Sequence, residues 1–190
     1  MGSDEARFRI LGIPGSLRRG SYNRGLLRAA VEVAPEGVEI QIAELGQIPL
    51  YNADVEANGA PEPVRELKDW IGRADALLIA TPEYNYSIPG VLKNAIDWAS
   101  RPPSETPLRH KPIALMGASG GLSGTIRAQM ALRQVFVFTE SFVMLKPELM
   151  VPRAPELFDA DGNLQDPAIR DRVRAVIEAL IGWTRRLRTD

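Results

Sequence analysis

Cysteine is absent from this sequence of 190 residues, and that absence removes several kinds of chemistry at once. Disulfides, thiolate nucleophiles, iron–sulfur clusters and cysteine-ligated zinc are all excluded. Histidine occurs once, as His110, so a mechanism that needs two histidines is excluded too, and we expect no metal site. A chain without cysteine fits a reducing compartment, and we expect a cytoplasmic protein.

An excess of charge and long apolar runs are also missing. The formal net charge is -1, so the chain offers no strongly basic face for the phosphates of a nucleic acid. The apolar runs fall short of the ~20 residues that a bilayer-spanning helix needs, and the first ten residues lack the apolar segment of a signal peptide. We therefore expect neither a nucleic-acid partner nor membrane insertion.

The apolar residues that are present alternate between two periods along the chain, as they do in βαβα units. Short apolar or alternating runs predict five strands, at Phe8–Ile13, Val38–Ile42, Ala76–Ala80 and Ile113–Met116, with the last between Phe142 and Val151, where Pro147 interrupts it. Apolar residues at helical spacing predict five helices, over Leu26–Ala34, Val64–Ile71, Val91–Ala99, Ser123–Phe138 and Ile169–Trp183. We expect one domain over residues 1–190, with residues 1–6 disordered.

The apolar patterns of the strands also indicate their places in the sheet. The strands near residues 76 and 112 are apolar throughout, so helices should cover both of their faces. Val38–Ile42 alternates between apolar and polar residues, which favours an edge position. We therefore predict a three-layer α/β sandwich around a five-stranded parallel sheet of order 2-1-3-4-5. In such sheets ligands bind beyond the carboxyl ends of the strands, so the loops after strands 1, 3 and 4 are the candidate site.

The loop after the first strand combines glycines with polar side chains. Ser16, Ser21 and Asn23 supply neutral donors, and the planar guanidinium of Arg18 suits phosphate oxygens. The helix that follows directs its free N–H groups and the positive end of its dipole to the same place. The loop is thus a candidate cradle for one phosphate, although Ser21 and Asn23 could equally cap the helix while the glycines turn the chain.

Two competing phosphate motifs are missing from this position. No GxGxxG follows the first strand, so a dinucleotide-binding Rossmann unit is not supported. No GxxxxGK[ST] occurs there either, which argues against an NTP-hydrolysing P-loop.

The third and fourth loops have a different chemistry. Thr81–Gly90 is stiff and aromatic with polar edges, which suits the flank of a flat heterocycle, or else a turn whose tyrosines cover the core. Gly117–Gly124 is rich in small residues that let backbone N–H groups approach a ligand, or it is merely flexible. Arg127 follows, and it pairs with an acidic group or lies in solvent. A phosphate joined to a planar ring is the shape of FMN.

Several blocks of the sequence resemble the NADPH-dependent FMN reductase family, which includes bacterial quinone, azo-dye and chromate reductases. The blocks that carry this resemblance span almost the whole chain: Gly15–Arg18 with Ser21–Asn23, Ile48–Asn52, Thr81–Asn85, Pro89–Trp98, Ser119–Gly121 and Leu157–Asp159. The resemblance implies a flavodoxin-like fold, an FMN cofactor and NADPH or NADH as electron donor.

The resemblance also implies a role for each block of the site. Those expected to bind the phosphate end of FMN are Ser16, Arg18, Ser21, Tyr22 and Asn23. Those expected along the isoalloxazine, largely through backbone contacts, are Pro82, Glu83, Tyr84 and Asn85, with Ser119, Gly120 and Gly121 at its other edge. No catalytic side chain is assigned, because the flavin carries the chemistry.

The expected activity is hydride transfer from NAD(P)H to bound FMN, and then reduction of a small-molecule acceptor by ping-pong kinetics. Quinones, azo dyes, flavins and metal oxyanions such as chromate all remain open as acceptors, as does the choice between NADPH and NADH. The alternatives are a flavodoxin-type electron carrier without direct NAD(P)H oxidation, which the near-neutral charge disfavours, and a module that has lost its cofactor.

Two further expectations concern the rest of the surface. The resemblance implies a homodimer or homotetramer, in which Val135–Phe138 either contributes to the interface or is buried in the protein's own core. Arg109, His110 and Lys111 precede the fourth strand, at the end of the sheet away from the candidate site. We therefore expect these three side chains to be solvated and uninvolved.

Overall fold

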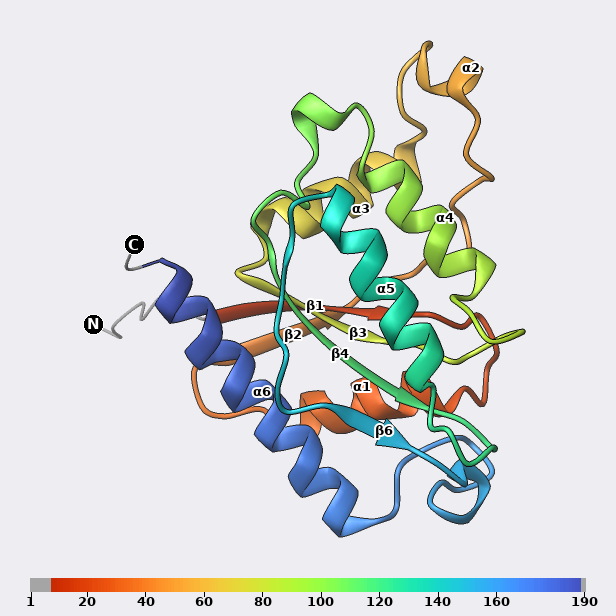
Figure 1. Ribbon diagram of the computed structural model, residues 1–190, viewed down its shortest axis with the longest axis vertical. Helices are drawn as coiled ribbons and strands as arrows, with labels where there is room; N and C mark the ends of the chain where they lie inside the picture. Colours follow the sequence, from red (N-terminus) through yellow and green to blue (C-terminus); the bar gives the residue numbers. More distant parts are fainter. Residues whose placement is uncertain (1–7, 189–190) are drawn as a thin grey trace.

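The computed structural model describes residues 8–188, in which a parallel sheet lies between two layers of helices (Figure 1). The strands are β1 (Phe8–Pro14), β2 (Val38–Ile42), β3 (Ala76–Ala80), β4 (Pro112–Ala118), β5 (Phe142–Val143) and β6 (Leu149–Val151). The helices are α1 (Tyr22–Glu32), α2 (Ala53–Glu56), α3 (Glu62–Arg73), α4 (Gly90–Ala99), α5 (Ile126–Phe138) and α6 (Pro167–Leu187). The expected disorder of residues 1–6 concerns a segment outside the described residues.

The sheet has the predicted order, β2-β1-β3-β4-β5, and all of its pairings are parallel. The edge position of β2 is confirmed. The predicted last strand is present in two pieces: β5 pairs with the start of β4, and β6 pairs with its end. Pro147 lies between the two pieces, where a residue without an N–H cannot continue a ladder of hydrogen bonds. This order, with helices on both faces, is the flavodoxin-like fold.

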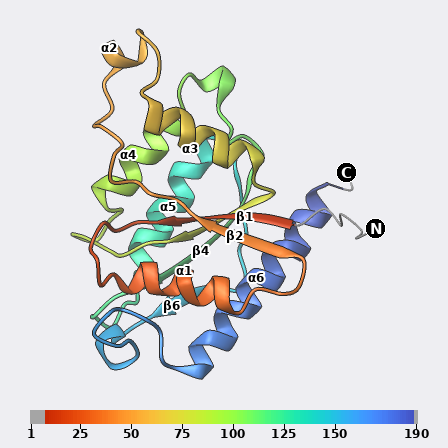
Figure 2. The same ribbon diagram turned by 180° about the vertical axis from the view of Figure 1, so that it is seen from behind.

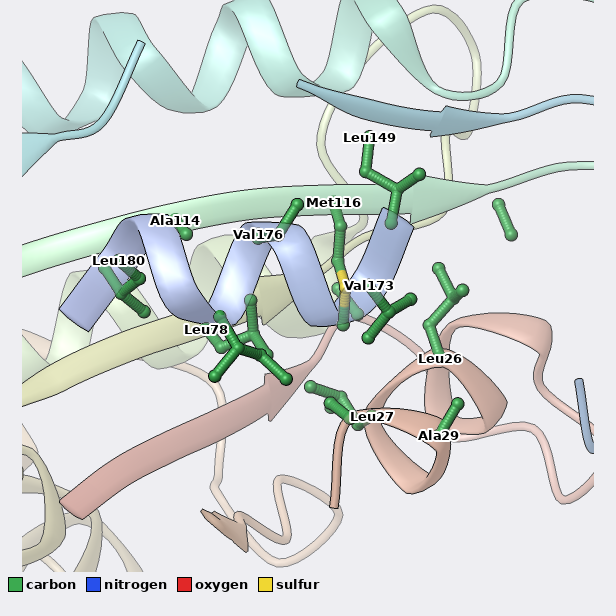
Figure 3. Packing of buried hydrophobic residues seen from close by; sticks show 14 of the residues in the cluster. Leu26, Leu27, Ala29, Leu78, Ala114, Met116, Leu149, Val173, Val176 and Leu180 are labelled. Carbon is green, nitrogen blue, oxygen red and sulfur yellow. The ribbon is translucent and has the colours of Figure 1, made fainter. Parts of the chain in front are cut away.

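Helices α1 and α6 cover one face of the sheet, and α3, α4 and α5 cover the other (Figures 1 and 2). Successive strand residues point to opposite faces, so Leu78 of β3 packs toward α1 and α6 while Leu77 and Ile79 pack toward the other layer. Figure 3 shows the first of these cores, in which Leu26 of α1 and Val173 of α6 approach Met116 of β4. The two apolar layers explain why β3 has no polar residue.

Side-chain caps at the N-cap residue begin α1, α2 and α6, whereas α3, α4 and α5 begin without one. The Asp166 carboxylate accepts the N–H of Ile169 at 2.9 Å and Pro167 follows it, so α6 begins at Pro167, two residues before the apolar stretch that predicted it. Helix α5 begins at Ile126, three residues later than the predicted Ser123. Thr125 has a φ of 76°, in the left-handed region, which ends the preceding turn and delays the helix. The short helix α2 was not predicted.

The segment before β4 differs in part from expectation. His110 and Arg109 are exposed at the amino end of β4, as predicted. The expectation of a solvated Lys111 is wrong, because its ammonium donates to the carbonyl oxygen of Ala74 at 2.7 Å. Burial lowers the pKa of Lys111, and the nearby Asp75 opposes that change. Sequence alone could not show that α3 ends beside this lysine.

Among residues 8–188, no helix combines the length and the apolar character that crossing a membrane demands.

The close approach of β4 to the loops beside it generates a stability prediction. A Cβ on Gly117 would lie well under 3.0 Å from the Thr125 hydroxyl and from the Thr81 carbonyl oxygen. Gly117→Ala should therefore lower the free energy of unfolding by about 1–3 kcal/mol, as overpacking does. The matched control is Gly182→Ala in α6, where a Cβ meets nothing within 4 Å. It should raise stability by roughly 0.5–1 kcal/mol. Urea denaturation measures the free energy of unfolding of both variants. Equal effects of the two substitutions would show that close packing around Gly117 is not what excludes a side chain there.

Candidate active site

Three loops meet at the carboxyl edge of the sheet. They are loop 1 (residues 15–21), loop 3 (residues 81–89) and loop 4 (residues 119–125). The N–H of Gly15 donates to the carbonyl oxygen of Ala80 at 2.8 Å, which joins loop 1 to the start of loop 3. A Cβ on Gly15 would lie 2.9 Å from Pro82 Cδ, so only glycine allows this approach without a shift. The edge predicted from the strand order is the place where these loops assemble.

The start of α1 has the character of both a helix cap and an anion cradle. The Ser21 hydroxyl accepts the N–H of Arg24 at 3.3 Å, and the buried Ser16 hydroxyl accepts the N–H of Arg18 at 3.3 Å. The first N–H groups of a helix have no partner inside it, and they carry the positive end of the dipole. At Tyr22 and Asn23 these N–H groups are available to an anion, even though Ser21 caps the helix.

Arg18 lies exposed beside this helix start. Its guanidinium donates to the carbonyl oxygen of Gly20 at 2.7 Å and lies 4.9 Å from the centre of the Tyr22 ring. These two contacts use one of its five N–H groups and one face of its plane. The Arg18 side chain is therefore held near the cradle with donors to spare.

The Asn23 side chain forms two hydrogen bonds within the protein that the sequence did not indicate. Its Nδ2 donates to the carbonyl oxygen of Ala118 at 2.9 Å, and its Oδ1 accepts the N–H of the same residue at 2.9 Å. The side chain is buried, and it ties α1 to the end of β4. What Asn23 offers a ligand is accordingly its backbone N–H rather than its carboxamide oxygen.

Loop 3 contains a tight turn of two residues. Tyr84 and Ser87 exchange backbone hydrogen bonds at 3.1 and 2.9 Å, and Asn85 and Tyr86 between them both have positive φ. This is the pattern of a type I′ turn, in which a residue as large as tyrosine is uncommon. Both tyrosines are exposed, so the interpretation that they cover the core is wrong. The turn presents aromatic rings at the edge of the site.

Glu83 caps α5 from a distant part of the chain. Its carboxylate accepts the N–H of Arg127 at 2.9 Å and that of Ala128 at 3.3 Å, and it forms an ion pair with the Arg127 guanidinium. Thr125, at the N-cap position, makes no side-chain cap of its own. Burial opposes ionisation of Glu83, but the hydrogen bonds from Arg127 and Ala128 outweigh it and lower the pKa of the carboxyl.

Arg127 joins loop 3 to α5, which resolves the two possibilities left open for it. Besides the pair with Glu83, it donates to the Ser123 hydroxyl at 2.9 Å. Its guanidinium also lies 3.7 Å from the centre of the Tyr86 ring, a cation–π contact. Arg127 therefore pairs with an acidic group and holds the strained turn of loop 3 in place.

Loop 4 is anchored at its first residue, and the two glycines that follow are exposed. The N–H of Ser119 donates to Val151, and the carbonyl oxygen of Ser119 accepts the N–H of Ala154, each at 3.0 Å. Gly120 and Gly121 are exposed, and a Cβ on Gly121 would meet nothing within 4 Å. The small residues thus leave backbone groups of this loop uncovered by side chains.

The assembled edge suits binding and orientation better than acid–base chemistry. Glu83 is fully paired, His110 lies at the opposite end, and residues 8–188 contain no group of three potential metal ligands of the His, Asp or Glu type. What remains is a helix start whose free N–H groups suit an anion, beside an open, neutral surface of backbone groups and aromatic rings. That arrangement fits a phosphorylated, flat, uncharged ring system.

Comparisons with known proteins agree with this chemistry. The family model described as NADPH-dependent FMN reductase matches residues 8–156. An NAD(P)H-dependent FMN reductase of Pseudomonas aeruginosa is 52% identical over 95% of this chain and 97% of its own length. An NAD(P)H:quinone oxidoreductase of Solanum tuberosum is 46% identical over 91% of both chains. The solved structure of the flavoenzyme NAD(P)H:acceptor oxidoreductase of Paracoccus denitrificans has a TM-score of 0.84 at 35% identity, covering 94% of this chain and 97% of its own.

The contacts of Glu83 generate a prediction about stability and pH. Glu83→Gln keeps the shape of the side chain but removes its charge, and should lower the free energy of unfolding by about 1.5–3 kcal/mol at neutral pH. Because the folded-state pKa is lowered, the contribution of the carboxylate is present above its unfolded pKa. It is lost as the pH falls through the folded-state pKa. The free energies of unfolding of the wild type and of Glu83→Gln should therefore become equal in acid.

Urea denaturation at neutral and acidic pH measures this difference. Glu66→Gln, at an exposed position of α3, is the control and should change stability by less than about 0.5 kcal/mol. A difference between wild type and Glu83→Gln that does not shrink in acid would show that charge is not what Glu83 contributes.

Proposed function

This chain belongs to the NADPH-dependent FMN reductase family and is an FMN-dependent enzyme that takes electrons from NAD(P)H, and from that premise we propose that its acceptor is a quinone. The observation that carries the proposal is the open, neutral edge formed by loops 3 and 4 beside the start of α1, where a flat acceptor could lie on a flat cofactor. The similarity to the quinone oxidoreductase of Solanum tuberosum supports the same acceptor class.

The phosphate of FMN would bind at loop 1 and the first turn of α1. The groups that would hold it are the hydroxyls of Ser16 and Ser21, the guanidinium of Arg18, and the backbone N–H groups of Tyr22 and Asn23. Contacts of Ser16, Ser21 and Asn23 within the protein already orient this loop before a ligand arrives. A preorganised site loses little entropy on binding.

The isoalloxazine ring would lie between loops 3 and 4. Pro82, Glu83, Tyr84 and Asn85 would offer backbone groups along one edge, while Ser119, Gly120 and Gly121 would approach the other. The Glu83 side chain takes part indirectly, because its pairing with Arg127 fixes the backbone of loop 3. The side chains of this part of the site therefore position backbone donors and acceptors.

When bound, FMN supplies the capacity to accept a hydride from NAD(P)H and to pass electrons on to the acceptor. The residues of this chain bind and orient the partners and need supply no acid or base for the hydride step. A single open face would admit the donor and the acceptor in turn, which predicts ping-pong kinetics. The same open face would admit azo compounds, free flavins and metal oxyanions such as chromate as further acceptors.

The test of this function is a visible spectrum of the purified protein reconstituted with FMN. Anaerobic addition of NADPH should bleach the flavin bands within the time of mixing, and a benzoquinone should restore them. Parallel lines in double-reciprocal plots of steady-state rates should follow. Bound flavin that a quinone reoxidises poorly, while another acceptor does so rapidly, would contradict the quinone assignment. Intersecting lines would contradict the proposal that the electron donor and the acceptor use a single open face in turn.

We also propose that residues 1–190 form one domain and that the protein acts in the cytoplasm. Two copies of the chain would associate through α5 as a homodimer. The outer face of this helix exposes Met130 (57%) and Val137 (76%). Exposed Tyr86 adjoins its first turn through Arg127. Phe136 is buried in the protein's own core, whereas Val137 and Phe138 are exposed, so the expected burial of this segment is confirmed only in part and its contribution to an interface stays a prediction. Exposed large apolar side chains gathered on one helix often mark interaction sites, and here the helix begins beside the turn of loop 3.

Met130→Glu should disrupt such a dimer, because a charge would be buried in an apolar interface. Light scattering after gel filtration should show the mass of two chains for the wild type and of one chain for the variant. Val31→Glu, at an exposed position of α1 in the opposite layer, is the matched control and should remain dimeric. A wild type with the mass of one chain would refute the proposal, and a mass of four chains would extend it to a tetramer.

A further inference from the structure

A small hairpin packs against the start of α1 without contributing any residue to the site described above. We call it the 158–164 hairpin, because Phe158 and Leu164 pair across it as an antiparallel bridge. It lies beside the first turns of α1 in both ribbon views (Figures 1 and 2). The ring of Phe158 lies 5.1 Å from that of Tyr22, which begins α1. The hairpin is thus in contact with the helix start proposed to bind phosphate.

The carboxylate of Asp159 organises this hairpin. Oδ1 accepts the backbone N–H groups of Asp161 at 3.0 Å and Asn163 at 2.7 Å. Oδ2 accepts the side-chain amides of Asn163 at 3.1 Å and Gln165 at 3.0 Å. The backbone N–H of Asn163 is the main cause of a lowered pKa at Asp159, which keeps the carboxyl ionised at neutral pH. One charged group therefore satisfies four donors and orients the Asn163 side chain.

Asn163 and Gly162 connect the hairpin to α1 through Arg28. Asn163 Oδ1 accepts from Arg28 Nε at 2.8 Å, and the carbonyl oxygen of Gly162 accepts from Arg28 Nη2 at 2.9 Å. A Cβ on Gly25 would lie well under 3.0 Å from the same Gly162 oxygen. A Cβ on Gly162 would in turn lie 2.9 Å from the carbonyl group of Gly20. The hairpin thus contacts the backbone on both sides of residues 21–23.

From this arrangement we infer that Asp159 is a positioning residue for the FMN phosphate. It touches neither cofactor nor substrate. By closing the hairpin it holds Gly162 against Gly20 and Gly25, and so fixes where the backbone N–H groups of Tyr22 and Asn23 point. The inference rests on the proposed binding of phosphate at loop 1. It predicts that Asp159 matters for a flavin that carries a phosphate and not for one that lacks it.

The test compares FMN with riboflavin, which has the same ring and no phosphate. Asp159→Asn keeps the size of the side chain but places an amide donor opposite the donors of Asn163 and Gln165. Quenching of flavin fluorescence should show FMN binding about tenfold weaker in this variant, the effect of losing hydrogen bonds to a charged group. Riboflavin affinity, and kcat at saturating FMN, should equal those of the wild type.

Two further variants make the comparison specific. Asp161→Asn is the matched control, because it changes a carboxylate of the same hairpin that accepts no hydrogen bond among residues 8–188, and it should bind both flavins like the wild type. Arg28→Lys breaks the contact between hairpin and helix from the other side and should weaken FMN binding without affecting riboflavin. Thermal unfolding of each flavin-free variant establishes that it is folded.

The outcomes separate this inference from the proposed function. A wild type that binds FMN no better than riboflavin would refute phosphate binding at loop 1. If the wild type prefers FMN, the inference is overturned by Asp159→Asn with unchanged FMN affinity. Equal weakening for both flavins, or an equal effect of Asp161→Asn, would also overturn it.

Discussion

The candidate site depends on one buried pair of hydrogen bonds, between the carboxamide of Asn23 and the backbone of Ala118. Breaking such a pair would leave the polar groups of both partners unsatisfied in the core, so the start of α1 is held against the end of β4. Loop 1 runs from β1 into the start of α1, and loop 4 leaves the sheet at the end of β4. The Asn23 side chain therefore ties the start of α1 to the small-residue loop that follows β4.

Elsewhere at this edge, too, side chains form hydrogen bonds and ion pairs within the protein. They leave backbone groups to face a ligand. Glu83 satisfies the free N–H groups of α5, and Arg127 holds the tyrosine turn of loop 3. Gly15 and Gly117 let neighbouring strands and loops approach where any Cβ would clash. An enzyme whose cofactor carries the chemistry needs this kind of rigidity more than it needs an acid or a base.

Two surfaces beside the site contact it from opposite faces of the sheet: the 158–164 hairpin and the exposed face of α5. The 158–164 hairpin supports the helix start from the α6 side of the sheet, through backbone contacts that only glycine permits. On the opposite side, α5 places an exposed apolar face next to the turn that Arg127 holds. A change at either surface would reach the candidate site through short, packed connections rather than through a flexible loop.

Periodicity in the sequence determined the strands, most of the helices, the edge position of β2 and the three loops that meet, because burial against a sheet imposes spacings that are visible along the chain. The resemblance carried by the loop residues determined the family. Only the tertiary structure decided that the carboxamide of Asn23 pairs with Ala118, that Glu83 caps a helix 44 residues away, and that Lys111 is half-buried against α3. A polar side chain in a loop has the same local pattern whether it faces a ligand, a backbone group or solvent, and only folding brings its partner to it.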